Sequence, residues 1–290
     1  MADFLREMAA ASRLRCEAAR RERTSDELRQ RIADGEPPPE LLLDRFDIIA
    51  EIKHRSPRDG ALGVDTGVDA GVDLGGALHD EAARAEIYAE GGAAAVSVLT
   101  EPSRFGGDLG HLERVAAALA PRGIPAMRKD FLVDSYQLLE ARAAGAGGVL
   151  LIAALLDDEA LADMLDLAED LQLFVLLECF DAGELERCGR LLDEPRFHER
   201  GNDGRLLIGV NSRDLRTLEV DDSRLEALAP LLPHAAPAVA ESGLQVPADA
   251  VRLATAGYRL ALVGTALMQD RRPGQLVRTM RDAGRAALGE

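Results

Sequence analysis

Lysine is almost absent from this sequence. Only two of its 34 basic residues, Lys53 and Lys129, are lysines, and all the others are arginines. Arginine supplies surface charge equally well, but it cannot replace a compact ammonium group whose pKa the protein can tune. We therefore expect both lysines to lie where such an ammonium is required, with chance retention as the alternative.

Long apolar runs and pairable cysteines are also lacking. No run approaches the ~18 uncharged apolar residues of a membrane span, and charges interrupt the N-terminus too often for a signal peptide. We expect a cytoplasmic protein without membrane contact. The three cysteines, Cys16, Cys179 and Cys188, have no metal-ligand spacing and cannot all pair, so reduced thiols are expected.

Positive charge is scarce overall. The formal net charge of −17 disfavours binding to nucleic acid and to anionic membranes. A phosphate-bearing ligand would therefore have to be held by a local site rather than by a basic surface.

Eight short apolar runs alternate with stretches of helical periodicity such as 134–145, 158–171 and 246–257. Continuous apolar strands are typical of a parallel sheet that is buried on both faces, and eight such units close as a barrel. The sequence therefore predicts an α/β fold, a (β/α)8 TIM barrel. Its strands are expected at 48–53, 94–100, 124–131, 148–153, 173–178, 206–211, 236–242 and 260–265.

Residues 1–46 precede the first strand and form an expected N-terminal helical extension, followed by a barrel domain over 47–290. Residues 4–33 have the pattern of one or two amphipathic helices, which end at a proline-rich breaker. The pattern does not decide whether the extension caps one end of the barrel or contributes to its active site.

Two hydrophilic insertions are expected to be loops. The first, at 63–76, repeats Gly-Val-Asp three times, and its aspartates Asp65, Asp69 and Asp73 lack the spacing of a calcium loop. The second insertion covers 193–204.

Polar residues follow the apolar runs where a barrel places its active site, at the carboxyl ends of the strands. Glu51 and Lys53 share one face of the first strand because side chains alternate. Both lysines fall on this rim. Its polar residues are Glu51, Lys53, Lys129, Asp130, Glu178, Asn211, Arg213, Glu241 and Ser242.

Two of the rim carboxylates invite different interpretations. For Asp130 a structural ion pair is the favoured role. Glu178 ends a run of apolar residues with no basic neighbour in sequence, so we expect its surroundings to raise its pKa towards that of a general base.

The last two strand ends suggest a phosphate site. Barrels often bind phosphate in the loops after strands seven and eight, through backbone N–H groups and small residues. Here these loops contain Ser242 and Gly243, and Gly264 and Thr265. The alternative is that the glycines only make tight turns.

Together these segments resemble the indole-3-glycerol phosphate synthase family. The resemblance runs in order from about residue 47 to 270, and AEIK-x-x-SP with RKDF is its most specific part. The matching motifs are AEIKHRSPRDG (50–60), SVLTEPSRFGG (97–107), MRKDF (127–131), LLE (176–178), GVNSRDL (209–215), AESGL (240–244) and LVGTALM (262–268).

The resemblance implies a metal-free and cofactor-free lyase that acts on a small phosphorylated substrate. In that reaction 1-(2-carboxyphenylamino)-1-deoxyribulose 5-phosphate loses carbon dioxide and water to give indole-3-glycerol phosphate in tryptophan biosynthesis. By similarity Lys129 is the acid at the sugar carbonyl, Lys53 binds the anthranilate carboxylate, and Glu178 is the base in the dehydration. The division of proton transfers between the lysines stays open, as do partners among the enzymes of the pathway.

The family pattern also assigns supporting residues. It places Glu51, Asn211, Glu241 and Ser242 as polar groups that orient the substrate and the catalytic side chains. Phe131 is expected to be an apolar wall of the anthranilate pocket. Binding of phosphate and substrate falls to Ser56, Arg213, Gly243, Gly264 and Thr265.

Three departures from the family pattern bear on the function. The repeat at 63–76 lengthens the loop after the first strand, Ser212 replaces a common asparagine, and Cys179 follows the base where valine is usual. A paralogue in a specialised indole pathway would look similar. The sequence also leaves open a phosphoribosylanthranilate isomerase, a Schiff-base aldolase, and an inactive barrel kept as a binding subunit.

Overall fold

The protein folds around a closed barrel of eight parallel strands. The computed structural model describes residues 3–56, 60–61, 80–216, 219–221 and 223–289, with backbone only at 3, 56, 60 and 61. β1 closes the barrel by pairing with both β4 and β10, which confirms the TIM barrel. The barrel strands are β1 (Asp47–Ile52), β4 (Ala95–Leu99), β5 (Ala126–Lys129), β6 (Gly148–Ile152), β7 (Phe174–Cys179), β8 (Leu206–Asn211), β9 (Ala238–Glu241) and β10 (Leu260–Val263).

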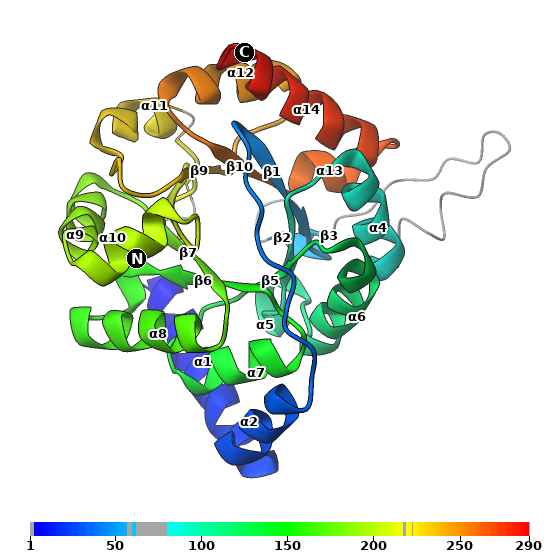
Figure 1. Cartoon of the computed structure of the whole chain (residues 1–290), viewed down its shortest axis with the longest axis vertical. Helices are drawn as coiled ribbons and strands as arrows, with labels where there is room; N and C mark the ends of the chain where they lie inside the picture. The colour runs from blue at the N-terminus through cyan, green and yellow to red at the C-terminus, as the bar shows by residue number, and fades with distance from the viewer. Residues whose placement is uncertain (1–2, 57–59, 62–79, 217–218, 222, 290) are drawn as a thin grey trace, which may run out of the picture.

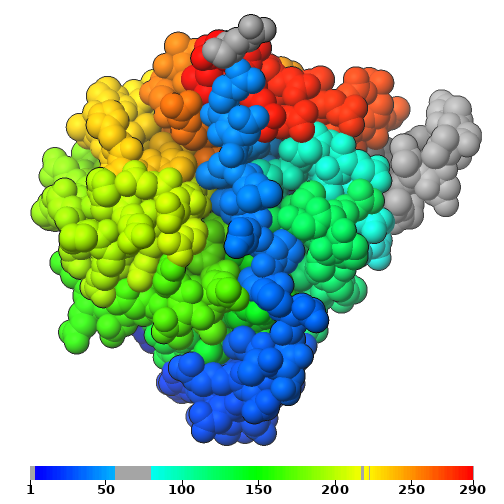
Figure 2. Space-filling view, viewed as in Figure 1, coloured from blue at the N-terminus to red at the C-terminus, as the bar shows by residue number. Residues whose placement is uncertain are grey.

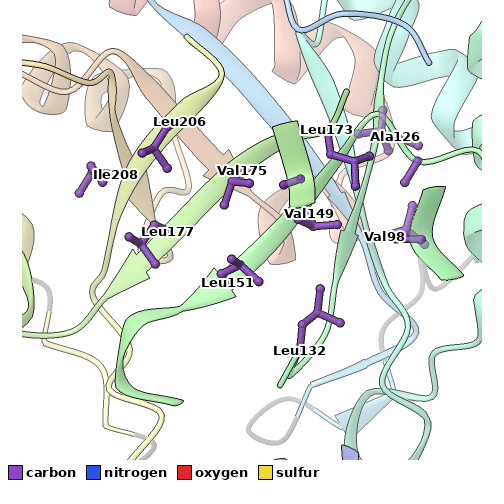
Figure 3. Close-up of a cluster of buried hydrophobic side chains, with 14 of the residues drawn as sticks. Val98, Ala126, Leu132, Val149, Leu151, Leu173, Val175, Leu177, Leu206 and Ile208 are labelled. Carbon is purple, nitrogen blue, oxygen red and sulfur yellow. The ribbon is translucent and has the colours of Figure 1, made fainter. Parts of the chain in front are cut away.

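Alternate residues of each strand face opposite sides of the barrel wall. Ile49, Met127 and Leu176 belong to the cluster that fills the interior. The residues that alternate with interior positions along each strand belong to the second, outer cluster, and Val149 and Leu177 are examples in Figure 3. The same alternation directs Glu51, Lys129, Glu178, Asn211 and Glu241 inwards, each an even number of residues beyond an interior apolar side chain.

Helices surround the strands (Figure 1). Several begin at an aspartate whose carboxylate accepts a backbone N–H of the first turn, as at Asp80, Asp108, Asp157 and Asp181. The helices after β1 are α4 (Glu81–Gly91), α5 (Pro102–Phe105), α6 (Leu109–Leu119), α7 (Tyr136–Ala143), α8 (Asp158–Asp170), α9 (Ala182–Leu192), α10 (Pro195–Asn202), α11 (Arg224–Leu228), α12 (Pro247–Ala256), α13 (Thr265–Gln269) and α14 (Pro273–Ala287).

Smaller elements complete the chain. A two-stranded antiparallel ribbon of β2 (Arg55–Ser56) and β3 (Gly60–Ala61) follows β1. Three 3-10 turns lie at η1 (Ala120–Arg122), η2 (Ala153–Leu155) and η3 (Ala229–Leu231).

The N-terminal extension consists of two helices, α1 (Asp3–Glu22) and α2 (Ser25–Ala33). Leu5 and Met8 of α1 are buried in the cluster that fills the barrel interior, and the Phe4 ring contacts Phe131, just beyond the carboxyl end of β5. The first helix therefore lies at the carboxyl end of the strands, a position that the sequence pattern did not decide.

The segment between α2 and β1 covers the opposite end of the barrel. It crosses the face seen in Figure 2 as a blue strip between the helices. A side chain at Gly147, just before β6, would approach Pro39 O to 2.8 Å, and one at Gly204, just before β8, would approach Leu43 Cδ1 to 3.2 Å. The extension thus reaches both ends of the barrel.

The second insertion is not the predicted loop. Residues 195–202 form α10, with Pro195 in its first turn, and the Phe197 ring is fully buried beneath the guanidinium groups of Arg196 and Arg200. Both arginines also pair with Asp166 of α8. Its hydrophilic residues led to the prediction of a loop, because the sequence does not show that Arg196 and Arg200 pair with a neighbouring helix and cover a buried ring.

The Gly-Val-Asp repeat at 63–76 lies outside the residues that the structure describes. Within the described residues, no helix combines the length and the apolar composition needed to cross a membrane.

Replacing Phe197 by alanine tests the correction to α10. Loss of a fully buried ring should lower the free energy of unfolding by about 3–5 kcal/mol, measured by urea denaturation. The matched control is Leu42→Ala, because Leu42 is 74% exposed and its truncation should cost less than about 0.5 kcal/mol. Equal effects of the two substitutions would contradict a packed α10.

Candidate active site

A pocket opens at the carboxyl end of the barrel strands. It is lined by residues from nearly every strand end and by the loops that follow. The side chains and loop residues of its lining are Glu51, Lys53, Leu99, Phe105, Lys129, Asp130, Phe131, Leu150, Ile152, Glu178, Asn211, Arg213, Leu215, Ser242, Gly243, Leu244, Gln245, Leu262, Val263, Gly264, Thr265 and Ala266.

Lys53 and Glu51 form an ion pair on one side of the pocket. Lys53 Nζ lies 2.8 Å from Glu51 Oε1, and both side chains are largely buried. A Cβ atom at Gly264 would come within 2.2 Å of Glu51 Oε1 and 2.9 Å of Lys53 Nζ. Glycine at 264 therefore leaves room for this ion pair in its observed position, a role that the sequence did not suggest.

Lys129 reaches two carboxylates of the barrel interior. Its Nζ donates to Glu241 Oε2 at 3.0 Å and to Glu178 Oε2 at 3.4 Å. Glu241 is fully buried and does not line the pocket. A Cβ at Gly209 would lie 2.2 Å from Glu241 Oε1, so the glycine of β8 makes room for this carboxyl group.

Glu178 is held by an amide whose orientation is fixed. Asn211 Nδ2 donates to Glu178 Oε1 at 2.9 Å, while the backbone N–H of Arg213 donates to Asn211 Oδ1 at 2.9 Å. Because an N–H can only donate, these two bonds leave the amide one orientation. Lys129 and Asn211 together direct the Glu178 carboxylate.

Burial and charge together decide where a proton resides in this cluster. Three carboxyl groups, Glu51, Glu178 and Glu241, lie near two ammonium groups, the charge of Arg213 also acts on Glu51, and a buried charge is costly unless it is paired. Burial raises the pKa of Glu241 to about 8, and the charge of Glu178 adds to this rise against the opposing effect of Lys129. Its Oε1 is buried with no hydrogen-bond partner among the described residues. Glu241 is therefore the carboxyl group of this cluster in which burial favours the protonated form.

Neighbouring charges shift the pKa values of Glu51 and Lys129 so that both groups stay ionised. Burial opposes ionisation of Glu51, but Lys53 and Lys129 outweigh it and hold the pKa of Glu51 below its usual value. Burial also opposes the charge on Lys129, yet Glu241 and Glu178 raise the pKa of Lys129 above that of a free lysine. Lys129 is an ammonium group throughout the physiological range.

Aromatic rings form one wall of the pocket. Phe105 and Phe131 both line it, with ring centroids 6.2 Å apart, and Phe4 of α1 meets Phe131 edge-on at 6.0 Å. Glu101 positions Phe105 by accepting the backbone N–H groups of residues 103–105. The wall thus combines two barrel loops with the N-terminal extension.

Asp130 has the structural role that the sequence favoured. Its carboxylate accepts from Arg15 Nη2 at 2.7 Å and from Thr100 Oγ1 at 2.8 Å, and Arg128 lies 3.5 Å away. Arg15 also pairs with Glu101. The ion pairs of Arg15 therefore join α1 to the strand ends beside Lys129.

The loop after β9 turns sharply. Ser242 has a φ of 67° and Gly243 a φ of 79°, so two consecutive residues occupy the left-handed region. Serine adopts this conformation at a cost of about 1–3 kcal/mol, and such strain concentrates at functional sites. Gly243 adopts its positive φ without strain, and the turn places Ser242 at the edge of the pocket.

The structure brings the expected site residues together. All of them line the pocket except Glu241, which lies beneath Lys129, and Ser56, which is in β2 but whose side chain lies outside the described part of the chain. Sequence reasoning missed Phe105, Leu215 and Gln245. Phe105 lies in one of the family motifs, but apolar residues after a strand carry no signal that separates a pocket wall from the core.

Titration of Glu241 predicts a dependence of stability on pH. Above the ordinary carboxyl pKa of 4.5 the unfolded chain has released this proton, whereas the folded protein keeps it until about pH 8. The folded state binds more protons in that window, so stability falls as the pH rises. Relative to Glu241→Gln, which is neutral throughout, the parent should lose up to about 1.4 kcal/mol per pH unit.

Urea denaturation of parent and variant between about pH 5.5 and 7.5 measures this difference. Glu226→Gln, at an exposed ion pair with Arg252, is the control and should keep the slope of the parent. If Glu241→Gln also kept that slope, the proton would not reside on Glu241.

Sequence comparison places the chain among known proteins. The family model for indole-3-glycerol phosphate synthase matches residues 6–280. Indole-3-glycerol phosphate synthase of Nocardioides sp. is 42% identical, covering 92% of this chain and 94% of the relative. Indole-3-glycerol phosphate synthase 1 of Streptomyces coelicolor is 41% identical, covering 92% and 91%.

Solved structures support the fold alone. The 3-hexulose-6-phosphate synthase of Salmonella typhimurium superposes with a TM-score of 0.58 at 13% identity, covering 83% of this chain and all of the other. Thiamine phosphate pyrophosphorylase from Pyrococcus furiosus gives 0.53 at 14%, covering 84% and 98%. From the family match and the relatives, the chain belongs to the indole-3-glycerol phosphate synthase family.

Proposed function

We propose that the protein is an indole-3-glycerol phosphate synthase, a carboxy-lyase of tryptophan biosynthesis. It converts 1-(2-carboxyphenylamino)-1-deoxyribulose 5-phosphate into indole-3-glycerol phosphate with loss of carbon dioxide and water. The observation that carries the proposal is the convergence of Lys53, Lys129 and Glu178 on one pocket beside an aromatic wall. Family membership supports the same reaction.

Ring closure joins the ring carbon that bears the carboxylate to the sugar carbonyl carbon. Negative charge develops on the carbonyl oxygen, and a donor directed at it lowers the barrier. Lys129 has this role, because Glu241 and Glu178 keep its amine protonated. Loss of carbon dioxide then leaves a hydroxyl group on the new ring.

Lys53 binds the anthranilate carboxylate. Its ammonium lies at the pocket surface and is anchored from below by Glu51. When the substrate carboxylate contacts Lys53, the ring carbon that bears this carboxylate points towards the sugar carbonyl carbon. Phe131 and Phe105 enclose the aromatic ring of the substrate. Orientation of this kind converts binding energy into rate.

Dehydration needs a base and an acid for the departing hydroxyl group. Glu178 is the base, and it removes a proton as the indole becomes aromatic. Asn211 holds one of its oxygens and Lys129 the other. Between the two steps Lys129 regains from solvent the proton that it gave to the carbonyl oxygen, and it then donates this proton to the hydroxyl group, which leaves as water.

The phosphate group is held at the loops after β9 and β10. Ser242 and Thr265 offer hydroxyl donors there, and Gly243 leaves its backbone open to a ligand. Arg213, half-buried at the rim, adds the positive charge that the acidic surface lacks. Ser56 is assigned to the same task by its motif.

The competing barrel reactions fit the site less well. An isomerase with a cysteine acid or base needs a thiol in the pocket, whereas Cys16, Cys179 and Cys188 are buried outside it. A Schiff-base aldolase needs a lysine whose pKa is lowered, and the carboxylates around Lys129 raise its pKa. The presence of Lys53, Lys129 and Glu178 together in the pocket argues against an inactive barrel.

The direct test incubates the purified protein with the carboxyphenylamino substrate and follows the rise of indole fluorescence. Turnover that is abolished by heat and saturates with substrate is expected. No fluorescence from protein that is folded by circular dichroism would refute the proposed reaction.

Substitution of the two lysines separates their roles. Lys129→Ala should lower kcat by about 10²–10⁴-fold, as expected for loss of a general acid, with a smaller change in KM. Lys53→Ala should lower kcat and also raise KM, because it removes the partner of the substrate carboxylate. Arg196→Ala, on the outer helix α10, should leave both constants near those of the parent. A Lys129→Ala rate within a fewfold of the parent would show that another group is the acid.

A further inference from the structure

Outside the pocket, two histidines and a glutamate from three separate elements meet at one point. His54 follows Lys53 at the end of β1, Glu81 is the first residue of α4, and His111 lies in the first turn of α6. One nitrogen of each ring and one oxygen of Glu81 all lie within 4.8 Å of one another. We propose that His54, Glu81 and His111 bind one divalent transition-metal ion of the zinc class.

The atoms are arranged around a single carboxylate oxygen. His54 Nε2 lies 2.9 Å and His111 Nε2 lies 3.5 Å from Glu81 Oε1. In tetrahedral zinc sites the ligand atoms lie about 2.0–2.2 Å from the ion, which places them a little over 3 Å from one another. Small rotations of these side chains therefore suffice to surround an ion.

His54 has bonding capacity that the described residues do not use. Although His54 Nε2 lies 2.9 Å from Glu81 Oε1, it is buried and makes no hydrogen bond of good geometry within the described part of the chain, whereas most buried polar atoms make one. The two rings also lie only 4.6 Å apart, so two imidazolium charges would repel each other. Neutral imidazoles beside an ionised carboxylate are the protonation states that a metal ion requires.

The donor set selects the class of ion. Magnesium and calcium prefer sites made entirely of oxygen, whereas imidazole suits zinc, copper, nickel and iron. Two imidazoles and one carboxylate supply three positions of a tetrahedron and leave the fourth to water. Glu81 Oε2, the other carboxylate oxygen, lies 3.2 Å from Arg114 Nη2, which orients the carboxylate. Arg114 is half exposed and can turn towards solvent as the cation binds.

The position of the cluster indicates a structural role. None of the three residues lines the pocket, so the ion does not meet the substrate. It would instead tie the segment that begins with Lys53 to the first turns of α4 and α6. The proposal is independent of the proposed reaction and does not alter its metal-free chemistry.

The test uses full-length protein without a histidine tag, treated with a chelator and then titrated with Zn²⁺ alone by calorimetry. We expect one ion per chain and a Tm that rises with Zn²⁺, because a ligand that binds the folded state stabilises it. Titration with Co²⁺ should give the visible absorption of a tetrahedral ion. Absence of binding at one equivalent would overturn the proposal.

Separate variants assign the ligands. His111→Gln and His54→Asn should each weaken Zn²⁺ binding by at least about 10-fold and abolish the rise in Tm. His198→Gln, on α10, is the matched control and should bind like the parent. If His111→Gln did not fold, the partly exposed His54 would still provide the test. Binding that survived both ligand variants, or was lost equally in the control, would show that the ion binds elsewhere.

Discussion

The charge balance in the barrel interior is the constraint on which the rest of the site depends. Lys129 lies between Glu178 and Glu241, and Lys53 rests on Glu51, all largely out of contact with water. Buried charges persist only when they are paired and hydrogen-bonded. The raised pKa of Glu241 favours its neutral form, so a fully buried carboxyl group can lie directly below the active site.

The buried charges also restrict which residues the backbone can carry around them and which basic residues the site can use. Gly209 and Gly264 leave the space that Glu241 and Glu51 occupy, and the turn at Ser242 begins directly after Glu241. The constraint also explains why lysine survives in a sequence that otherwise uses arginine. A guanidinium is larger than an ammonium and would not fit between two carboxylates that are placed for a single nitrogen.

Much of this arrangement follows from local sequence patterns. The eight apolar runs gave strands within one or two residues of their observed ends, because buried parallel strands leave a clear signal. Alternation along the first strand then placed Glu51 and Lys53 on one face, and the ends of the apolar runs placed Lys129 and Glu178 on the same rim. A rim of polar residues was therefore predictable without knowledge of the packing.

Features that depend on contacts between distant segments were not predictable. The two arginines that cover the Phe197 ring pair with Asp166 of α8, which lies well before them in sequence. The position of α1 rests on contacts of Phe4 and Arg15 with the ends of β4 and β5. The raised pKa of Glu241 and the grouping of His54 with His111 likewise depend on the closed barrel, and neither was predicted from the sequence.

Because the chain has only two lysines, a single spectroscopic measurement tests the central claim. Protein labelled with ¹³C at lysine Cε should give two side-chain resonances, and both should shift when a substrate analogue with a reduced carbonyl group is added. The resonance of Lys129 should also remain that of an ammonium group above the pH at which free lysine titrates. A lysine resonance whose chemical shift did not change on addition of the analogue would contradict the account. Loss of the Lys129 proton at a lower pH than for free lysine would also contradict it.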